Sequence, residues 1–156
     1  MKRFVIFPNE IHVSHSMRQL INSDRYRVSV NEAFDDVINN CGKVDGRNNM
    51  KGAWLGGQML DAYKELNKQG FAASVEVWEG ANLVGGLYGV TIGNSFFGES
   101  MFSLAPNTSK LALISLAAMM EDSGGLIDCQ FETSHLKSMG GRYISYEEYM
   151  EIISKS

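Results

Sequence analysis

Two places in the sequence carry polar side chains suited to acid–base and orienting chemistry among apolar neighbours. Asp128 and Gln130 stand two apart in LIDCQ, and Glu99 stands in FFGESMFS among aromatic and methionine side chains. If residues 126–130 form a strand, Asp128 and Gln130 share one face, where a carboxylate can orient a carboxamide. On these residues alone, a strand end whose Asp and Gln meet solvent or cap a neighbouring loop is the favoured interpretation. A carboxylate such as Glu99 is costly to bury unless a cation or hydrogen-bond donors meet it.

The stretch of residues 74–103 is predicted to form the three-stranded β-meander that positions Glu99. Residues 74–78, 83–91 and 96–102 alternate polar and apolar types or are rich in β-branched and aromatic ones, and Gly/Asn turns separate them. Four glycines in these strands leave the backbone without side-chain cover, so other atoms are expected to approach it closely there. They are Gly85, Gly86, Gly89 and Gly98.

The segments around the meander are predicted to alternate between strands and helices. Further strands are expected at residues 2–7, 25–30, 126–130 and 142–144. Helices are expected at residues 12–21, 31–41 with Gly42 as the stop, 54–69, 109–122, 133–140 and from 145 onward, with a loop at 43–51. A helix, three antiparallel strands and then helix, strand, helix, strand predict an α+β fold, with a central, mostly antiparallel sheet flanked by helices.

Composition and charge exclude several classes of protein. The chain has 156 residues, 44% of them hydrophobic, which is enough for a sizeable core. The net charge of −4 is untypical of a general nucleic-acid binder. Residues 1–51 carry eight Lys and Arg against six Asp and Glu, whereas residues 52–156 carry six against twelve. The second part would suit a cationic peptide and the first would suit phosphates, but on charge alone ordinary surface charge is the favoured interpretation.

Neither a membrane-spanning segment nor a metal site is expected. No apolar run is long enough to span a bilayer. His12 and His15 lack partners at ligand spacing, so no metal site is predicted. The two cysteines give no disulfide framework, which fits a reducing cytoplasm, and Cys129 is interpreted as a core thiol on the strand face opposite Asp128.

Several long motifs, in one order along nearly the whole chain, resemble those of the leucyl/phenylalanyl-tRNA–protein transferases. They are SVEVW, LVGGLYGV, FFGESMFS, N-x-S-K-x-A-L at residues 107–113, and LIDCQ, with FPNEIHVSHSMR upstream and HLKSMGGRYIS downstream. The resemblance implies a bacterial cytoplasmic enzyme that moves Leu or Phe, with Met as a further candidate, from aminoacyl-tRNA to the N-terminal Arg or Lys of an acceptor protein, and so marks it for degradation. It also implies an N-acetyltransferase-like acyltransferase fold and no cofactor.

The resemblance also implies the roles of individual residues. LIDCQ matches the family's catalytic motif residue for residue, so Asp128 and Gln130 are the expected catalytic pair. The residues expected to bind the aminoacyl group are Trp54, Leu87, Phe96 and Glu99, the last through a hydrogen bond to the substrate amino group.

The implied reaction is aminolysis of an activated ester. The nucleophile is an α-amino group with an ordinary pKa of about 7.7 to 8.0, so it needs positioning and modest base assistance. Asp128 is expected to hold Gln130 in one orientation and to favour the positive charge that develops on the attacking nitrogen. Gln130 is expected to accept a hydrogen bond from the amine.

The sequence departs from the family at the phosphate-binding side. The family has an additional N-terminal domain with a Trp-Trp-Ser-Pro type motif, most of which this chain is expected to lack. Residues 1–51 are then a remnant N-terminal segment packed on a catalytic domain of residues 52–156. His15 replaces an Arg of the family, and residues 19–24 are less basic. Weak tRNA binding is expected, through Arg18, Arg25 and Arg27.

Two other functions fit parts of the sequence. An acyl-CoA-dependent N-acyltransferase of small molecules or peptides would need a Gly-rich pyrophosphate turn, and the turn at residues 103–110 contains no glycine. A non-catalytic domain that binds aminoacyl or peptide groups would not need Asp128, Gln130 and Glu99 together.

Overall fold

The computed structural model describes residues 1–44 and 50–155, with side chains described over 1–42 and 59–155. The strands are β1 (Lys2–Ile6), β2 (Arg27–Val30), β3 (Ala72–Glu79), β4 (Asn82–Ile92), β5 (Ser95–Ser103), β6 (Ile127–Asp128) and β7 (Arg142–Ser145). The helices are α1 (His15–Asn22), α2 (Phe34–Val44), α3 (Met50–Lys68), α4 (Thr108–Met119), α5 (Ser134–Ser138) and α6 (Tyr146–Ile153), with one 3-10 turn at Pro8–Glu10.

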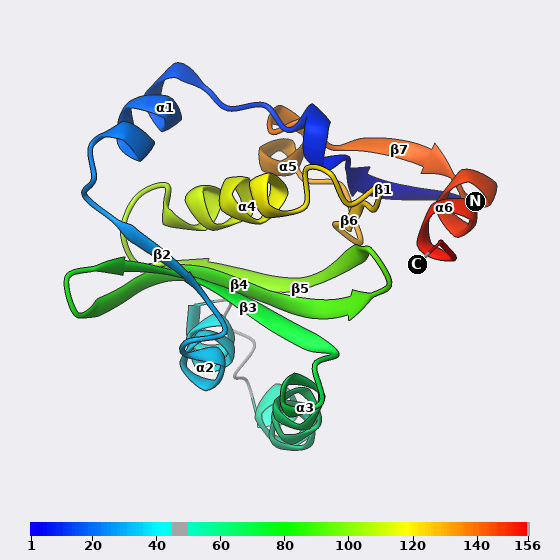
Figure 1. Ribbon diagram of the computed structural model, residues 1–156. Coiled ribbons are helices and arrows are strands. Elements are labelled where there is room, and N and C mark those ends of the chain that lie inside the picture. Colours follow the sequence, from blue (N-terminus) through cyan, green and yellow to red (C-terminus); the bar gives the residue numbers. More distant parts are fainter. Residues whose placement is uncertain (45–49, 156) are drawn as a thin grey trace.

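All seven strands belong to one sheet, in the order β2-β3-β4-β5-β6-β1-β7 (Figure 1). The pairing is antiparallel everywhere except between β5 and β6, which run parallel. Helices lie on both faces of the sheet, so the predicted α+β class with a mostly antiparallel sheet is confirmed. No described helix is long and apolar enough to cross a membrane.

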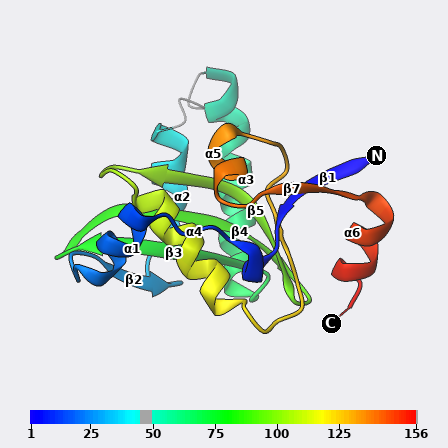
Figure 2. The same ribbon diagram turned by 90° about the horizontal axis from the view of Figure 1, so that it is seen from above.

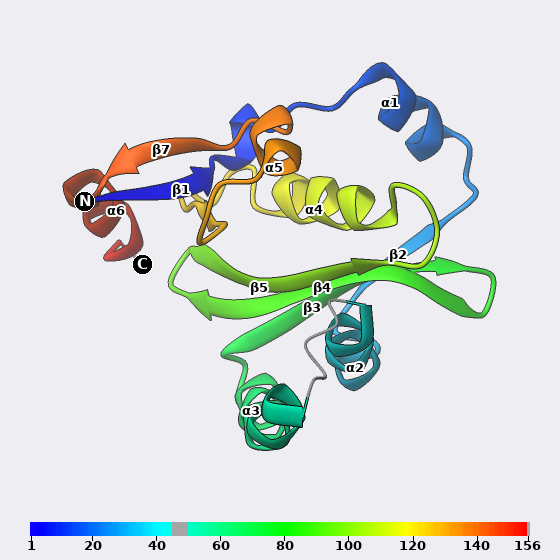
Figure 3. The ribbon, with the colours of Figure 1, turned by 180° about the vertical axis from the view of Figure 1, so that it is seen from behind.

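Helices α2 and α3 cover one face of the meander, and α4 covers the other, with α1 and α5 beside it (Figures 1 and 3). Helix α4 is apolar almost all round, and seven of its residues are buried. Its side chains form the main core with the face of the meander that carries Val75, Leu87 and Phe96. On the other face, Phe34 and Val37 of α2 pack with Tyr88 and Phe102. The meander is therefore buried on both faces.

Two predicted boundaries are wrong, and a third prediction can be compared with the structure only in part. Helix α2 continues past Gly42 to Val44, because one glycine inside a helix costs only about 1 kcal/mol and does not end it unaided. The strand predicted over 126–130 is limited to Ile127–Asp128, because Gln130 has a left-handed backbone with φ 71°. Of the predicted loop at 43–51, residues 45–49 lie outside the described residues.

The glycines of the meander are approached closely, as predicted, and the groups that approach them include the chain's own side chains. A Cβ on Gly85 would lie 2.4 Å from Oγ1 of Thr108, the first residue of α4. A Cβ on Gly89 would lie 2.7 Å from the ring of Phe96. Thr108 is fully buried, and its hydroxyl donates to the Val84 carbonyl at 2.8 Å. Gly85 thus lets α4 sit directly on the backbone of β4.

The strand β1 lies between β6 and β7, and helix α6 packs beside this part of the sheet (Figure 2). Both chain ends lie near α6. Strands β1 and β2 come from the predicted N-terminal segment, residues 1–51, and are hydrogen-bonded into the same sheet as the later strands. The division of the chain at residue 51 stays a prediction.

Candidate active site

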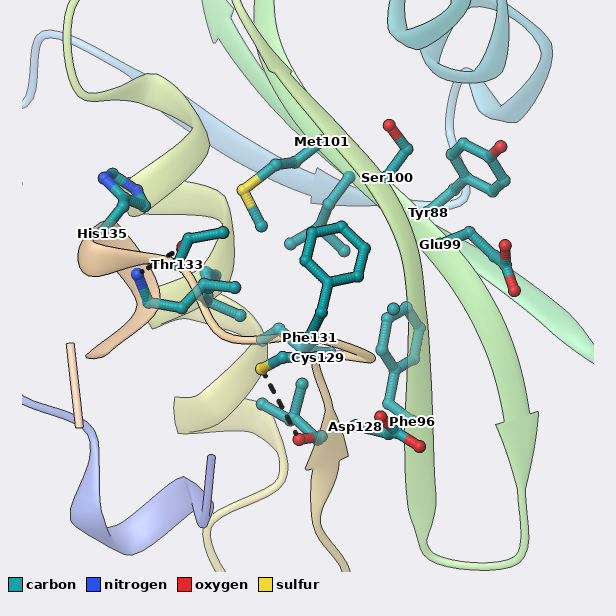
Figure 4. Close-up of a pocket in the computed structure, with 16 residues that line it drawn as sticks. Tyr88, Phe96, Glu99, Ser100, Met101, Asp128, Cys129, Phe131, Thr133 and His135 are labelled. Atoms are coloured by element: carbon teal, nitrogen blue, oxygen red, sulfur yellow. Dashed lines mark hydrogen bonds between the residues drawn. The ribbon is translucent and has the colours of Figure 1, made fainter. Parts of the chain in front are cut away.

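A cavity of about 300 Å³ opens beside β5, between the sheet, α4 and the segment that follows β6 (Figure 4). This volume is at the lower end of the range of small-ligand sites, about 300 to 1,000 Å³. Most of its wall is apolar, from Leu87, Phe96, Met101, Leu113, Leu116 and Phe131. Its polar lining includes Glu99, Asp128, Thr133 and His135. The cavity therefore combines an apolar pocket with a few polar groups.

A β-bulge places Glu99 at this cavity. Gly89 pairs with Gly98, but the preceding residue of β4, Tyr88, pairs with Ser100, so Glu99 is an extra residue on β5. A bulge re-aims the side chain of the extra residue. Glu99 points away from the cluster of Met101 and Phe131 (Figure 4), and it accepts a hydrogen bond from Tyr63 of α3. Burial and this carboxylate raise the pKa of the Tyr63 hydroxyl.

The carboxylate of Asp128 is fully buried and receives three hydrogen bonds. The Arg3 guanidinium donates to Oδ2 at 2.6 Å, and the Tyr149 hydroxyl donates to the same oxygen at 2.5 Å. The backbone N–H of Gln130 donates to Oδ1 at 2.7 Å. The costly burial of this charge is therefore offset by a cation and two neutral donors.

Gln130 is exposed, and both its backbone and its side chain are held. Its N–H is bound by Asp128, which supports the left-handed conformation at φ 71°. Its side-chain Nε2 donates to the carbonyl of Gly98 at 2.7 Å. This bond fixes the orientation of the amide and leaves Oε1 to accept a hydrogen bond from a ligand. The predicted pair is therefore in contact, through the Gln130 backbone and not through its side chain.

A second buried carboxylate, Glu76 on β3, has a structural role. It accepts hydrogen bonds from the hydroxyls of Ser29 and Ser74 and from the backbone N–H of Glu32. These donors tie β2 and the start of α2 to β3, on the side of the sheet where β2 forms the edge. Among the described side chains, Glu76 and Asp128 are the two buried charged ones, and only Asp128 lines the cavity by β5.

Cys129 lines the cavity and is half-buried, so its prediction as a core thiol is only partly right. The strand ends before it, and the expected alternation of side chains does not extend to this residue. Burial and the neighbouring Asp128 carboxylate raise the pKa of the thiol to about 12. A thiol with such a pKa is a poor nucleophile at neutral pH, so covalent catalysis by Cys129 is disfavoured.

Cys129 is therefore expected to resist alkylation in the folded protein. With its pKa at about 12, only roughly one thiol in ten thousand is ionised at pH 8. Iodoacetamide labelling at pH 8, followed by peptide mass spectrometry, should show slow modification of Cys129 in buffer and fast modification in urea. Labelling in buffer at the rate of a free thiol would contradict the assigned environment.

The cavity brings together four of the predicted site residues, Leu87, Phe96, Glu99 and Asp128. Gln130 lies beside them through its bonds to Asp128 and Gly98. Trp54 belongs to α3, and its side chain lies outside the described residues.

The three predicted tRNA-binding arginines lie away from the cavity. Arg27 is in β2 and Arg25 just before it, at the sheet edge separated from β5 by β3 and β4. Arg25 pairs with Glu79 at 2.8 Å, and Arg27 pairs with Glu32 at 3.0 Å. Arg18 is exposed on α1. Arg25 and Arg27 are thus each paired with a carboxylate of the protein itself, which neutralises their positive charge.

Sequence reasoning missed Arg3, Tyr149 and Phe131 as parts of the site. Tyr149 of the last helix is buried, and its hydroxyl contact with Asp128 joins separate segments of the chain, so the sequence shows no local pattern for it. Arg3 follows Lys2 directly before the apolar run of residues 4–7, where charged residues are ordinary, so the sequence held no local signal for it. Phe131 is 60% exposed and lines the cavity, and such exposure of a large aromatic side chain indicates a role in binding.

Comparison with known proteins finds a family model and relatives that match nearly the whole chain. The family model described as leucyl/phenylalanyl-tRNA protein transferase matches residues 5–154. A leucyl/phenylalanyl-tRNA–protein transferase of Flavobacterium johnsoniae is 46% identical over 97% of this chain and 71% of its own length. Its counterpart from Syntrophus aciditrophicus is 46% identical over 99% of this chain and 64% of its own length. The chain thus spans about two thirds of the length of these relatives.

One solved structure supports the fold alone. The crystal structure of a conserved protein of unknown function from Bacteroides thetaiotaomicron is similar, with a TM-score of 0.59. It is 12% identical, and the match covers 87% of this chain and 52% of that one.

Proposed function

Because the chain belongs to the leucyl/phenylalanyl-tRNA protein transferase family, we propose that it transfers Leu or Phe, with Met as a further candidate, from aminoacyl-tRNA to the N-terminal Arg or Lys of an acceptor protein. The observation that carries the proposal is the apolar cavity that has Asp128 and Glu99 in its lining and Gln130 beside it. The reaction takes place in the bacterial cytoplasm, and the modified protein is marked for degradation.

The cavity binds the side chain of the transferred amino acid. Leu87, Phe96 and Met101 offer an apolar wall, which favours a large apolar group without a matching polar partner. Glu99, turned aside by the bulge, binds the amino group of the donor, and Tyr63 holds its carboxylate. Trp54 of α3 is the further residue proposed to bind the aminoacyl group.

The acceptor α-amine attacks the ester carbonyl, the C–O bond to the tRNA ribose breaks, and the proton lost by the amine passes to the leaving ribose oxygen. Gln130 accepts a hydrogen bond from the amine through Oε1, because its Nε2 is already committed to the Gly98 carbonyl. Gln130 meets the amine, Asp128, the other member of the expected catalytic pair, acts through Gln130, and no protein nucleophile or cofactor enters the reaction. An amine with an ordinary pKa of about 8 needs little further activation.

The order of the elements also supports an N-acetyltransferase-like acyltransferase fold. Three antiparallel strands are followed by helix α4, strand β6, helix α5 and strand β7. The catalytic pair lies at and after β6, which is the strand that pairs parallel with β5.

One assay tests the function. The protein is incubated with Leu-charged tRNA and a peptide that begins with Arg, and in a parallel reaction with acetyl-CoA and the same peptide. Mass spectrometry should show a leucine-sized increase with charged tRNA and no acetyl-sized increase with acetyl-CoA. Acetylation alone would instead support an acyl-CoA-dependent enzyme, and no product in either reaction would support a binding domain.

Recognition of tRNA is expected to concentrate on its aminoacylated end. Because Arg25 and Arg27 are paired with Glu79 and Glu32, few cations are left to neutralise phosphates at the predicted surface. Each neutralised phosphate on a duplex contributes roughly −0.9 to the slope of log affinity against log salt, so a shallow slope is expected. A short aminoacylated acceptor-end mimic should be used nearly as well as whole charged tRNA, in assays at low and at physiological salt.

Glu79→Gln provides a matched test of this surface. If Arg25 binds phosphate, removing its partner should raise affinity for whole tRNA but leave the rate with the short mimic unchanged. Glu32→Gln is the parallel variant for Arg27. A steep salt slope, or an advantage of several orders of magnitude for whole tRNA, would contradict this prediction.

A further inference from the structure

Both oxygens of the Asp128 carboxylate are engaged in hydrogen bonds within the protein, and these bonds limit the role that Asp128 can have in the reaction. Oδ2 accepts from Arg3 and Tyr149, and Oδ1 accepts from the backbone N–H of Gln130. With both oxygens engaged and the Arg3 cation 2.6 Å away, little negative charge is directed at a reacting amine. Asp128 can therefore influence the reaction through its hydrogen bond to the backbone of Gln130.

The backbone of Gln130 needs this contact. A non-glycine residue at φ 71° is in the left-handed region, which costs about 1 to 2 kcal/mol relative to the ordinary conformations. The charge-assisted bond from its N–H to Asp128 offsets that cost. Because the side chain of Gln130 starts from this backbone, a change of φ would swing its amide away from Gly98 and out of line with the cavity.

Two groups from opposite ends of the described chain fix the carboxylate in turn. Arg3 comes from β1, and Tyr149 comes from α6. The Arg3 guanidinium also lies over the Tyr149 ring, 5.2 Å from its centroid, and the ring packs edge-on against Phe97. Tyr149 is buried in the small core beside β1, so its hydroxyl has little freedom to leave Oδ2. The rotamer of Asp128 is thus set by both neighbours.

We propose that Arg3 and Tyr149 are positioning residues of the transfer reaction, which hold the Asp128 carboxylate so that it locks Gln130 in the conformation that receives the attacking amine. Neither side chain touches the substrate. Their effect on turnover rests on the proposed function, but their effect on the Gln130 backbone does not.

The first test compares two tyrosine-to-phenylalanine variants in α6. Tyr149→Phe removes only the hydroxyl and keeps the ring that packs on Phe97 and Arg3. Its kcat is expected to fall about 10- to 100-fold, the effect of one hydrogen bond to a charged group, with an unchanged KM for the donor. Tyr146→Phe removes a hydroxyl from the neighbouring ring, which stacks on Tyr149, and should keep the wild-type kcat. Circular dichroism checks that both variants are folded.

Substitutions of Arg3 test the charge separately. Arg3→Lys keeps the cation and should retain more of the wild-type kcat than Arg3→Gln, again at unchanged KM. A purely structural role would lower stability in both variants and would not separate kcat from KM. Equal kcat in Arg3→Lys and Arg3→Gln would overturn the role of Arg3.

Amide hydrogen exchange at Gln130, followed by NMR, tests the inference without any turnover. Exchange of its N–H should be about 10-fold faster in Tyr149→Phe than in wild type and unchanged in Tyr146→Phe, because loss of one bond to the carboxylate loosens the other. If the wild type transfers no amino acid, the proposed function fails, and this measurement still decides the positioning role. Wild-type exchange at Gln130 in Tyr149→Phe would overturn it.

Discussion

Replacement of Asp128 by Asn is expected to lower kcat for transfer about 100-fold or more, in line with the loss of a preorganised polar group at a reacting centre. The Asn amide cannot accept from Arg3, Tyr149 and Gln130 at once, because its nitrogen is a donor and would face one of these donors. If the amide nitrogen faces Gln130, that N–H loses its acceptor, and if it faces Arg3 and Tyr149, these two groups no longer fix the side chain, so in either orientation Gln130 is held less firmly. Steady-state kinetics with Leu-charged tRNA and an Arg-starting peptide measures the effect.

The same variant should also be less stable. Loss of the anion leaves the Arg3 cation, about a third exposed, without its partner, which should lower the free energy of unfolding by about 2 kcal/mol. Gln130→Ala is the matched control, because it removes the exposed amide and should reduce transfer while stability stays within about 0.5 kcal/mol of wild type. Urea unfolding of both variants separates the two effects, and a full transfer rate in Asp128→Asn would refute the role given to this carboxylate.

Gly85→Ala is expected to destabilise the packing of α4 on the sheet. The added methyl group would lie 2.4 Å from Oγ1 and 2.5 Å from Cβ of Thr108, so α4 would have to move off β4. Overpacking of this kind costs about 3 kcal/mol, and α4 cannot relax without giving up the hydrogen bond from Thr108 to the Val84 carbonyl. Because Leu113 and Leu116 of α4 line the cavity, the donor KM should rise as well.

Gly80→Ala serves as the control for glycine removal in general. Gly80 has φ 59° and no atom within 4 Å of the added Cβ, so only the left-handed backbone cost of about 1 kcal/mol applies. Pairing Gly85→Ala with Thr108→Gly should recover part of the lost stability. Equal unfolding midpoints in urea for Gly85→Ala and Gly80→Ala would show that α4 adjusts to the methyl group freely.

Local signals in the sequence predicted most of the fold. The meander was predicted because its strands are joined by short turns. The last helix begins where predicted, because the Ser145 hydroxyl accepts from the N–H of Glu148 and caps it. Likewise, Ser14 caps α1 and Thr133 caps α5 through their side-chain oxygens. These features depend on a few neighbouring residues, so the pattern of residue types is enough to find them.

The site was predictable only in part. Its motif residues were found through resemblance, yet the way they are arranged depends on a bulge and on contacts between distant segments. The bulge at Glu99 shifts the register by one residue, which alternation along a single strand cannot reveal. The left-handed Gln130 ends a strand that its sequence would continue, because a bond to Asp128 outweighs the local preference. Asp128 itself is stabilised by Arg3, 125 residues away.

The position of β1 has a consequence for how the protein is made. This strand pairs with β6 and β7, so more than a hundred further residues must be translated after β1 before its partner strands are present. Until then both its edges offer unpaired backbone groups to other chains, and closing so long a loop is slow. The meander and α4 can fold earlier, as they are joined by short connections. The polypeptide should therefore pass through a partly folded, aggregation-prone intermediate, and a nascent chain stalled before β7 would hold a donor pocket but no completed catalytic centre.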